Sequence, residues 1–176
     1  MGDPIPLRFC PACGAPIERR FVYGRDRPIC PSCGYIHFVD PKVAAAAFVE
    51  QGGQVLLVRR AVSPEKGRWT LPAGFVEADE DPAATAAREC LEETGLEIEV
   101  QDLMEIVPGR EHPRGASIVL VYRARVVAGR LQPQDDVDQA GFFSPDEVPP
   151  LAFKATRRVI TAWQSGSPGS LPDGDR

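Results

Sequence analysis

The segment GFVEADEDPAATAARECLEETGL, residues 74–96, decides how this chain folds. Asp81 followed by Pro82 predicts a helix start, because a short polar side chain caps the first amides and a proline loses no hydrogen bond there. Gly95 predicts the helix end, since glycine adopts a left-handed conformation without steric cost. The alanines and the leucine in between favour a helix of about three and a half turns.

Three glutamates of this helix, Glu89, Glu92 and Glu93, stand at positions i, i+3 and i+4 and therefore share one face. Like charges at this spacing repel by about 0.2–0.5 kcal/mol per pair. A hard divalent cation such as Mg²⁺ takes oxygen ligands, so it removes the conflict and points to phosphate as a further ligand. Arg88 precedes Glu92 by one turn and is placed to hold that carboxylate. The alternative interpretation is a solvated acidic face without chemistry.

The segment resembles the Nudix box, G-x5-E-x7-R-E-U-x-E-E-x-G-U, at every fixed position, where U is an apolar residue. Cys90 fills the first apolar slot. The resemblance implies an α/β/α sandwich around a mixed sheet, and Mg²⁺ or Mn²⁺ as cofactor. It also implies hydrolysis of nucleoside diphosphates linked to another group. The catalytic residues that it implies are Glu89, Glu92, Glu93, Arg88 and Glu80, with Arg88 paired to Glu80 and the Gly74 carbonyl as an extra metal ligand.

The general base varies within this family. The sequence leaves Glu89 and an aspartate of a late acidic loop, Asp136 or Asp138, open for this role. A carboxylate in any of these positions could take the proton of the attacking water.

Four arginines are candidates for substrate binding. Two of them end a predicted strand, where an ordinary surface position is the alternative interpretation. The other two lie in the polar loop 108–115, and functional residues concentrate on such loops. The candidates are Arg59, Arg60, Arg110 and Arg114.

Two C-x2-C pairs, Cys10/Cys13 and Cys30/Cys33, are separated by sixteen residues that favour a β-hairpin. Four thiolates at this spacing can bind one Zn²⁺ tetrahedrally, and the segment resembles a zinc ribbon. The alternatives are a redox dithiol or unrelated thiols. The segment has few apolar residues, so zinc is expected to supply its folding energy. Its arginines favour a solvated ribbon surface over a nucleic-acid patch.

The chain has 176 residues, of which 43% are hydrophobic, and this predicts one domain with an appendage. Residues 43–49 are apolar throughout, which fits a strand buried on both faces. A hairpin turn is expected at residues 51–54, and a helix at residues 153–163. Further strands are expected at residues 55–58, 98–107, 117–127 and 140–143. The predicted divisions are a zinc ribbon at residues 8–38, a Nudix domain at 41–164 and a disordered tail at 165–176.

The formal net charge is −5, which argues against a general binder of nucleic acid or anionic membrane. We find no apolar run near the roughly 20 residues that span a bilayer, and no secretion pattern in residues 1–7. A cytoplasmic location is therefore expected, where five cysteines indicate metal or free thiols rather than disulfides. The family resemblance implies a homodimer.

The ribbon ahead of the box is similar to the NADH diphosphatase group, whose RNA-decapping members remove NAD caps. The S-Q-P-W-P-F-P-x-S motif of that group is absent from residues 106–113. The chain looks closer to zinc-ribbon Nudix proteins that act on ADP-ribose and FAD. This resemblance rests on the order of three parts: the ribbon, the linker G-Y-I-H-F-x-x-P-K-V and the box. A proline some sixteen residues past the box marks ADP-ribose enzymes, and Pro113 is one residue away from that position.

The expected function is therefore Mg²⁺-dependent cleavage of ADP-ribose or FAD, with release of AMP. Three alternatives are an NADH or NAD-cap diphosphatase, a regulator that senses a ligand with a Nudix-like domain, and a zinc module fused to an inactive domain.

Overall fold

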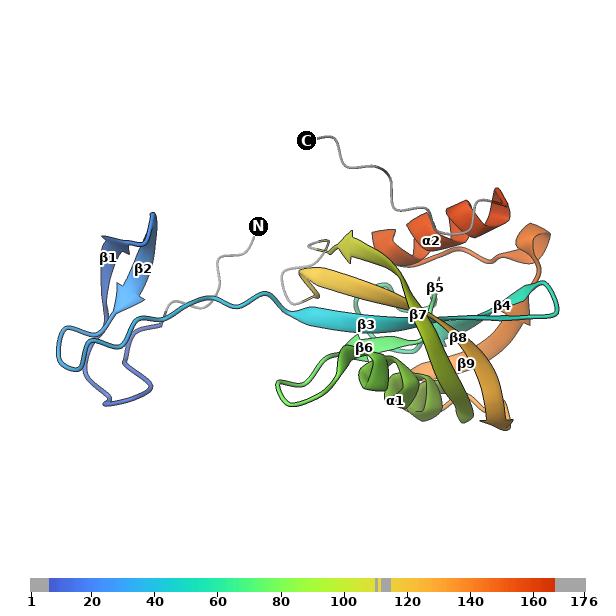
Figure 1. Cartoon of the computed structure of the whole chain (residues 1–176), viewed down its shortest axis with the longest axis horizontal. Coiled ribbons are helices and arrows are strands. Elements are labelled where there is room, and N and C mark those ends of the chain that lie inside the picture. The colour runs from blue at the N-terminus through green and yellow to red at the C-terminus, as the bar shows by residue number, and fades with distance from the viewer. Residues whose placement is uncertain (1–6, 110, 112–114, 167–176) are drawn as a thin grey trace. The chain divides into compact units, whose positions relative to one another are not determined.

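The computed structural model describes residues 7–109, 111 and 115–166 (Figure 1). The chain divides into two compact units, with the boundary between Pro41 and Lys42. Arg110, Arg114 and Pro113, which the sequence singles out, lie outside the described residues.

The first unit is built on one antiparallel hairpin with two tight turns. Its strands are β1 (Glu18–Val22) and β2 (Arg25–Ile29), as the sequence predicts. Each cysteine pair lies in a turn closed by a glycine amide: Gly14 donates to the Cys10 carbonyl at 2.9 Å, and Gly34 to the Cys30 carbonyl at 3.0 Å. Both glycines have positive φ, 73° and 77°, which residues with a side chain rarely adopt. The two turns thus bring four cysteines together.

The second unit is centred on a mixed seven-stranded sheet. Strand β3 pairs in parallel with β8 and antiparallel with β6, while β4 pairs antiparallel with β5 and β9. The hairpin between β3 and β4 is paired only near its turn, at Glu50–Val55 and Gln51–Gln54. The strands are β3 (Val43–Gln51), β4 (Gln54–Arg60), β5 (Trp69–Thr70), β6 (Ala73–Phe75), β7 (Leu96–Pro108), β8 (Ile118–Gly129) and β9 (Val137–Phe143).

Two helices cover opposite faces of this sheet, α1 (Pro82–Thr94) and α2 (Lys154–Gln164), and a short 3-10 helix, Pro145–Glu147, lies between β9 and α2 (Figure 1). The α1 side is a core cluster that includes Ala86 and Cys90. The α2 side is a second cluster that includes Val159 and Ile160. The predicted α/β/α sandwich around a mixed sheet is therefore confirmed.

Helix α1 begins and ends where the sequence predicts. The Asp81 carboxylate accepts the amides of Ala83 at 2.8 Å and Ala84 at 3.4 Å, which satisfies two donors of the first turn. Gly95 adopts φ 69° and donates its amide to the Leu91 carbonyl. These local caps fix the register of the glutamates along the helix.

Candidate functional site

Arg88 joins the loop before α1 to the acidic face of the helix. Its Nε and Nη2 donate to both carboxylate oxygens of Glu80, at 2.8 and 2.9 Å. Its Nη1 donates to Glu89 at 2.8 Å and to Glu92 at 3.0 Å. Hydrogen bonds from Arg88 hold the pKa of Glu80 down at about 2. The predicted Arg88–Glu80 pair is therefore present, and one guanidinium orients three carboxylates.

Gly74 lies directly against the carboxylate of Glu89. A Cβ atom at residue 74 would lie 1.9 Å from the Glu89 Cδ atom, far inside van der Waals contact. The backbone of Gly74 does not have positive φ, so the requirement for glycine here is steric rather than conformational. The glycine that opens the box thus leaves room for the acid that follows it by fifteen residues.

Glu93 is the most buried carboxylate of the box, with only 3% of its surface exposed. It accepts the amide of Ala73 at 3.2 Å. Burial, followed by the charges of Asp136 and Glu89, raises its pKa to about 9. Burial also raises the pKa of Glu89, against the opposing effect of Arg88. Glu93 therefore needs additional positive charge nearby to be ionised at neutral pH.

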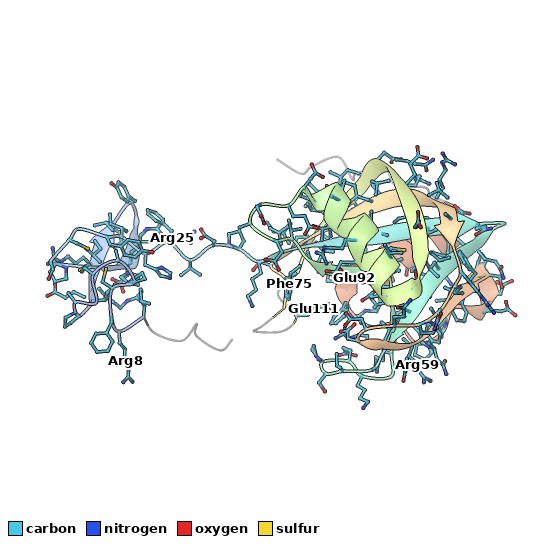
Figure 2. The ribbon with its side chains drawn as sticks, turned by 90° about the horizontal axis from the view of Figure 1, so that it is seen from below. Arg8, Arg25, Arg59, Phe75, Glu92 and Glu111 are labelled. Carbon is cyan, nitrogen blue, oxygen red and sulfur yellow. The ribbon has the colours of Figure 1, made fainter. Side chains whose placement is uncertain are left out.

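A cavity of about 470 Å³ adjoins the box and lies within the second unit. This volume is in the range that accommodates a nucleotide-sized ligand. Small apolar side chains from β3 and β8 form part of its wall, and two phenylalanines and several polar groups complete it. Figure 2 labels Phe75 and Glu111, which line the cavity, and Glu92 of α1. The lining residues include Ala44, Ala46, Arg60, Gly74, Phe75, Glu111, Asp136 and Phe153.

The two arginines that end β4 have different surroundings. Arg60 lines the cavity, and its Nε donates to the Pro64 carbonyl at 2.8 Å. Arg59 is not among the lining residues and instead pairs with Asp138, with contacts of 2.7 and 3.0 Å. This pairing lowers the pKa of Asp138. Of the two aspartates left open as a base, Asp136 lines the cavity and Asp138 is engaged with Arg59.

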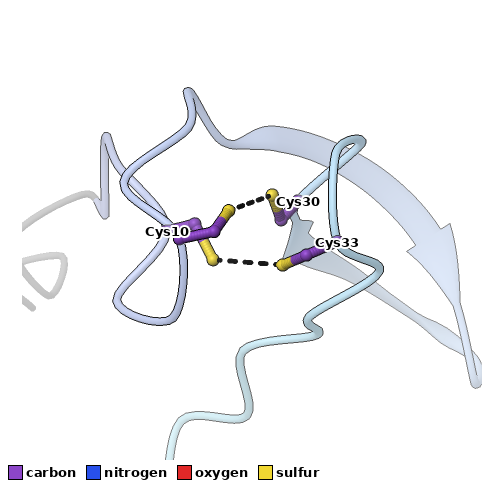
Figure 3. Close-up of side chains that lie close together, drawn as sticks. Cys10, Cys30 and Cys33 are labelled. Atoms are coloured by element: carbon purple, nitrogen blue, oxygen red, sulfur yellow. Dashed lines mark hydrogen bonds between the residues drawn. The ribbon is translucent and has the colours of Figure 1, made fainter.

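The four cysteines of the first unit form a compact sulfur cluster (Figure 3). All four Sγ atoms lie within 4.8 Å of one another, with Cys10–Cys33 at 3.6 Å and Cys13–Cys30 at 3.5 Å. Zn–S bonds of about 2.3 Å in a tetrahedron separate sulfurs by roughly 3.8 Å. The cluster therefore fits a structural Zn²⁺, whereas unrelated thiols would not converge.

Family models match both units of the chain. A model described as the NUDIX domain matches residues 40–164, and one described as Nudix N-terminal, a zinc ribbon, matches residues 8–39. The chain belongs to the Nudix hydrolase family.

Similar proteins include an "ADP-ribose pyrophosphatase" of Methanocaldococcus jannaschii, 35% identical over 75% of this chain and 80% of that protein. A "NAD-capped RNA hydrolase NudC" of Pseudomonas aeruginosa is 33% identical over 82% of this chain, which spans only half the length of that relative. The crystal structure of a NUDIX hydrolase from Nitrosomonas europaea superimposes with a TM-score of 0.80 at 32% identity, over 93% of this chain and 96% of that one.

The glutamates of this Nudix box fit a hard cation by donor type and by charge. Glu93 is buried and Glu89 is half-buried, and the charge of Glu89 adds to the effect of burial in raising the pKa of Glu93. The Arg88 guanidinium forms ion pairs with both Glu89 and Glu92, so a bound cation would compete with it for these carboxylates. Within the described residues, the four cysteines are the one set of three or more ligands that already converge within 4.8 Å.

Sequence reasoning missed two residues of the cavity wall as functional candidates. Glu111 lies in the loop between β7 and β8, and Phe153 is the first residue of the predicted helix at residues 153–163. Glu111 contacts Lys154 and Arg157, which are more than 40 residues away along the chain. No local sequence pattern predicts this contact, because the contacting residues are far apart in the sequence and follow no helical or strand repeat.

No helix among the described residues is long and apolar enough to cross a membrane.

Proposed function

We propose that this Nudix protein is a Mg²⁺-dependent hydrolase that cleaves the diphosphate bond of a nucleoside diphosphate joined to a second group. ADP-ribose and FAD are the leading substrates, and AMP is a product. The observation that carries this proposal is the placement of the box beside a nucleotide-sized cavity. Gly74 and Arg60 line that cavity, and the carboxylate of Glu89 lies against Gly74.

The roles of the site residues follow from their contacts. Arg60 lines the cavity and contributes positive charge to it. Arg88 orients Glu89 and Glu92 while Glu80 fixes Arg88. Glu89 or Asp136 takes the proton of the attacking water, since both lie at the cavity or against its wall.

Mg²⁺ held by Glu89, Glu92 and Glu93, with the Gly74 carbonyl as a further ligand, would neutralise the diphosphate and acidify a water molecule. The buried carboxylates would then remain ionised at neutral pH. Their raised pKa values without a cation are the reason to expect that metal binding releases protons.

The substrate choice is supported by the relatives. The M. jannaschii protein is named an ADP-ribose pyrophosphatase and spans most of this chain. The second candidate is hydrolysis of NADH or of NAD caps, which the NudC relatives support. This chain spans half their length and lacks the S-Q-P-W-P-F-P-x-S motif after the box, so ADP-ribose or FAD is the better choice.

The test is product analysis with Mg²⁺ over ADP-ribose, FAD, NADH, NAD⁺, NAD-capped RNA, diadenosine polyphosphates and nucleoside triphosphates, each with and without chelator. We expect AMP from ADP-ribose or FAD, and none in chelator. Glu92→Gln should lower kcat by a factor of about 10²–10³, because a metal-binding charge is lost. Glu97→Gln, at an exposed residue of β7, is the control and should leave kcat unchanged. Equal activity of wild type and Glu92→Gln would contradict the metal site.

The sensor alternative has its own outcome in this test. Tight binding of ADP-ribose without turnover of any compound would favour a ligand-sensing regulator. Homodimer formation and a cytoplasmic location stay predictions, and light scattering at several protein concentrations would test the first.

A further inference from the structure

We propose that Phe153, with the Arg60 guanidinium over its ring, is the surface against which the substrate's nucleobase lies, and that Glu111 positions this surface. The inference rests on the proposed function for the identity of the substrate. It assigns the base specificity to three residues from separate parts of the chain: the end of β4, the loop between β7 and β8, and the start of α2.

Phe153 and Arg60 lie against each other in the cavity wall. The guanidinium carbon of Arg60 lies 5.1 Å from the centre of the Phe153 ring, and both residues line the cavity. Much of the remaining wall near them is small and aliphatic, including Ala44 and Ala46. A planar base gains stacking energy from an aromatic ring or from a guanidinium plane, whereas an aliphatic wall offers only contact.

The backbone does not hold Phe153 in place by its own preference. Phe153 has φ 36°, a conformation that residues with side chains adopt rarely and that surrounding contacts must maintain. It is also the N-terminal cap residue of α2, and it makes no side-chain capping hydrogen bond. Something else must therefore satisfy the first amides of this helix.

Glu111, in the loop between β7 and β8, does so for the first of these amides. Its Oε2 accepts the amide of Lys154, the first residue of α2, and its Oε1 accepts from Arg157 Nη2 at 2.8 Å. A carboxylate at a helix start also interacts favourably with the helix dipole. Glu111 itself lines the cavity, so one side chain joins the two parts of the wall and sets the place of Phe153.

A second ion pair provides the matched comparison. Arg158, the neighbour of Arg157 on α2, pairs with Glu105 of β7. This pair also ties α2 to β7, but neither residue lines the cavity. A purely structural role for the Glu111 contact predicts that both pairs behave alike, while a positioning role predicts that only Glu111 affects ligand binding.

The first experiment measures binding of AMP and of ribose 5-phosphate by calorimetry with Mg²⁺. AMP contains the base, and ribose 5-phosphate does not. We expect Phe153→Leu to weaken AMP binding about tenfold and to leave ribose 5-phosphate unchanged, because leucine keeps the apolar volume and removes the ring. Phe153→Tyr, which keeps the ring, should bind AMP as wild type does. Unchanged AMP binding by a folded Phe153→Leu variant overturns the proposal.

The second experiment tests Glu111 in steady-state kinetics with the substrate found above. We expect Glu111→Ala to raise KM at least fivefold, with kcat within twofold of wild type. Glu111→Gln keeps an acceptor for the Lys154 amide, so its KM should lie between those of Glu111→Ala and wild type. Glu105→Ala should change stability without changing KM. Equal KM values for Glu111→Ala and Glu105→Ala would overturn the positioning role, as would a loss of kcat alone.

The outcomes separate this inference from the proposed function. Turnover of ADP-ribose with no effect of Phe153→Leu on AMP binding leaves the function standing and removes the base surface. Phe153-dependent AMP binding without turnover of any diphosphate keeps the base surface and removes the function.

Discussion

The carboxylate of Glu89 is held from two sides, by the guanidinium of Arg88 and by the bare backbone of Gly74. The first contact sets its direction and the second leaves room for it. A side chain at residue 74 would not disturb the fold, because the colliding atoms are the far end of a flexible glutamate. It would displace the one part of Glu89 that the proposed chemistry uses.

Gly74→Ala should therefore lower kcat at least 100-fold while the melting temperature changes by only a few degrees. Gly141→Ala is the matched control, since it is also a strand glycine without positive φ, and its added Cβ would meet the Phe143 ring at an ordinary 3.4 Å. Activity and thermal unfolding of both variants give the answer. A similar loss of kcat in both would show that the effect is not specific to Glu89.

The Glu80–Arg88 pair should make stability depend on pH. Arg88 lowers the pKa of Glu80 from 4.5 to about 2 on folding, so the stability gained from ionised Glu80 is fully present above about pH 4.5. It is lost as the pH falls toward 2. We expect the difference in free energy of unfolding between wild type and Glu80→Gln to be constant from pH 5 to 7 and to shrink below pH 4.5.

Urea denaturation at a series of pH values measures this difference. Glu77→Gln, an exposed residue of the same loop, serves as the control and should show little pH-dependent difference. A Glu80→Gln difference that stays constant down to pH 3 would contradict the role of the ion pair.

At the scale of elements, helix α1 carries most of the site and is specified by its own ends. Asp81 caps the first turn, and Gly95 ends the last in a left-handed conformation. Between them, Ala86 and Cys90 are fully buried against the sheet. The caps thus place the glutamates, and the packing keeps them there.

Asp81→Ala should lower the free energy of unfolding by about 1 kcal/mol, because the amides of Ala83 and Ala84 lose their acceptor. The packed helix keeps its position, so kcat should stay within about twofold. Asp79→Ala, two residues earlier and exposed, should leave stability unchanged. An equal effect of the two substitutions in chemical denaturation would show that capping does not matter here.

Elements of the fold that depend on local chemistry could be predicted from the sequence, and those that depend on distant partners could not. Helix α1 has its caps within its own segment, and β3 begins with an uninterrupted apolar run at residues 43–49. The short strands β5 and β6 have too few residues to show a period, so they were not predicted. The parallel pairing of β3 with β8 is a choice among several strands of similar composition.

The same division applies to the site. Arg88 and its acids are close in sequence, so their pairing could be predicted. Arg59 and Asp138 are 79 residues apart, and nothing local reveals that they satisfy each other. The two arginines Arg59 and Arg60 look equivalent in the sequence, and only the sheet decides which one faces the cavity.

At the scale of the whole molecule, the chain consists of two units with separate stabilising interactions. The Nudix unit contains two apolar cores. The first unit, within its described part, buries few hydrophobic side chains besides Cys10, Ile29 and Cys30. We therefore expect the ribbon to depend on zinc for its folding, and the Nudix unit to fold without it.

Removal of zinc should unfold the ribbon at residues 8–38 and leave the thermal transition of the Nudix unit within a few degrees. Metal analysis should give one zinc per chain for the wild type and none for Cys13→Ser. Cys90→Ala, which removes the buried cysteine of the other unit, should keep the zinc. Hydrogen exchange of the ribbon amides reports its folding directly, and protection that persists after verified zinc removal would contradict the prediction.

The run of alanines in β3 has a consequence for how this enzyme could diversify. Ala44 and Ala46 point to the cavity, while Ala45 and Ala47 pack on the side of α1. Strand β3 therefore sets two distances. One is the depth of the cavity that is available to a substrate, and the other is how closely α1, with its glutamates, approaches the sheet. A larger apolar side chain at residue 44 would narrow the cavity without moving α1, so this position can set the size of substrate that fits. Residues 45 and 47 have no such freedom, because larger side chains there would push α1 and its glutamates away from the sheet.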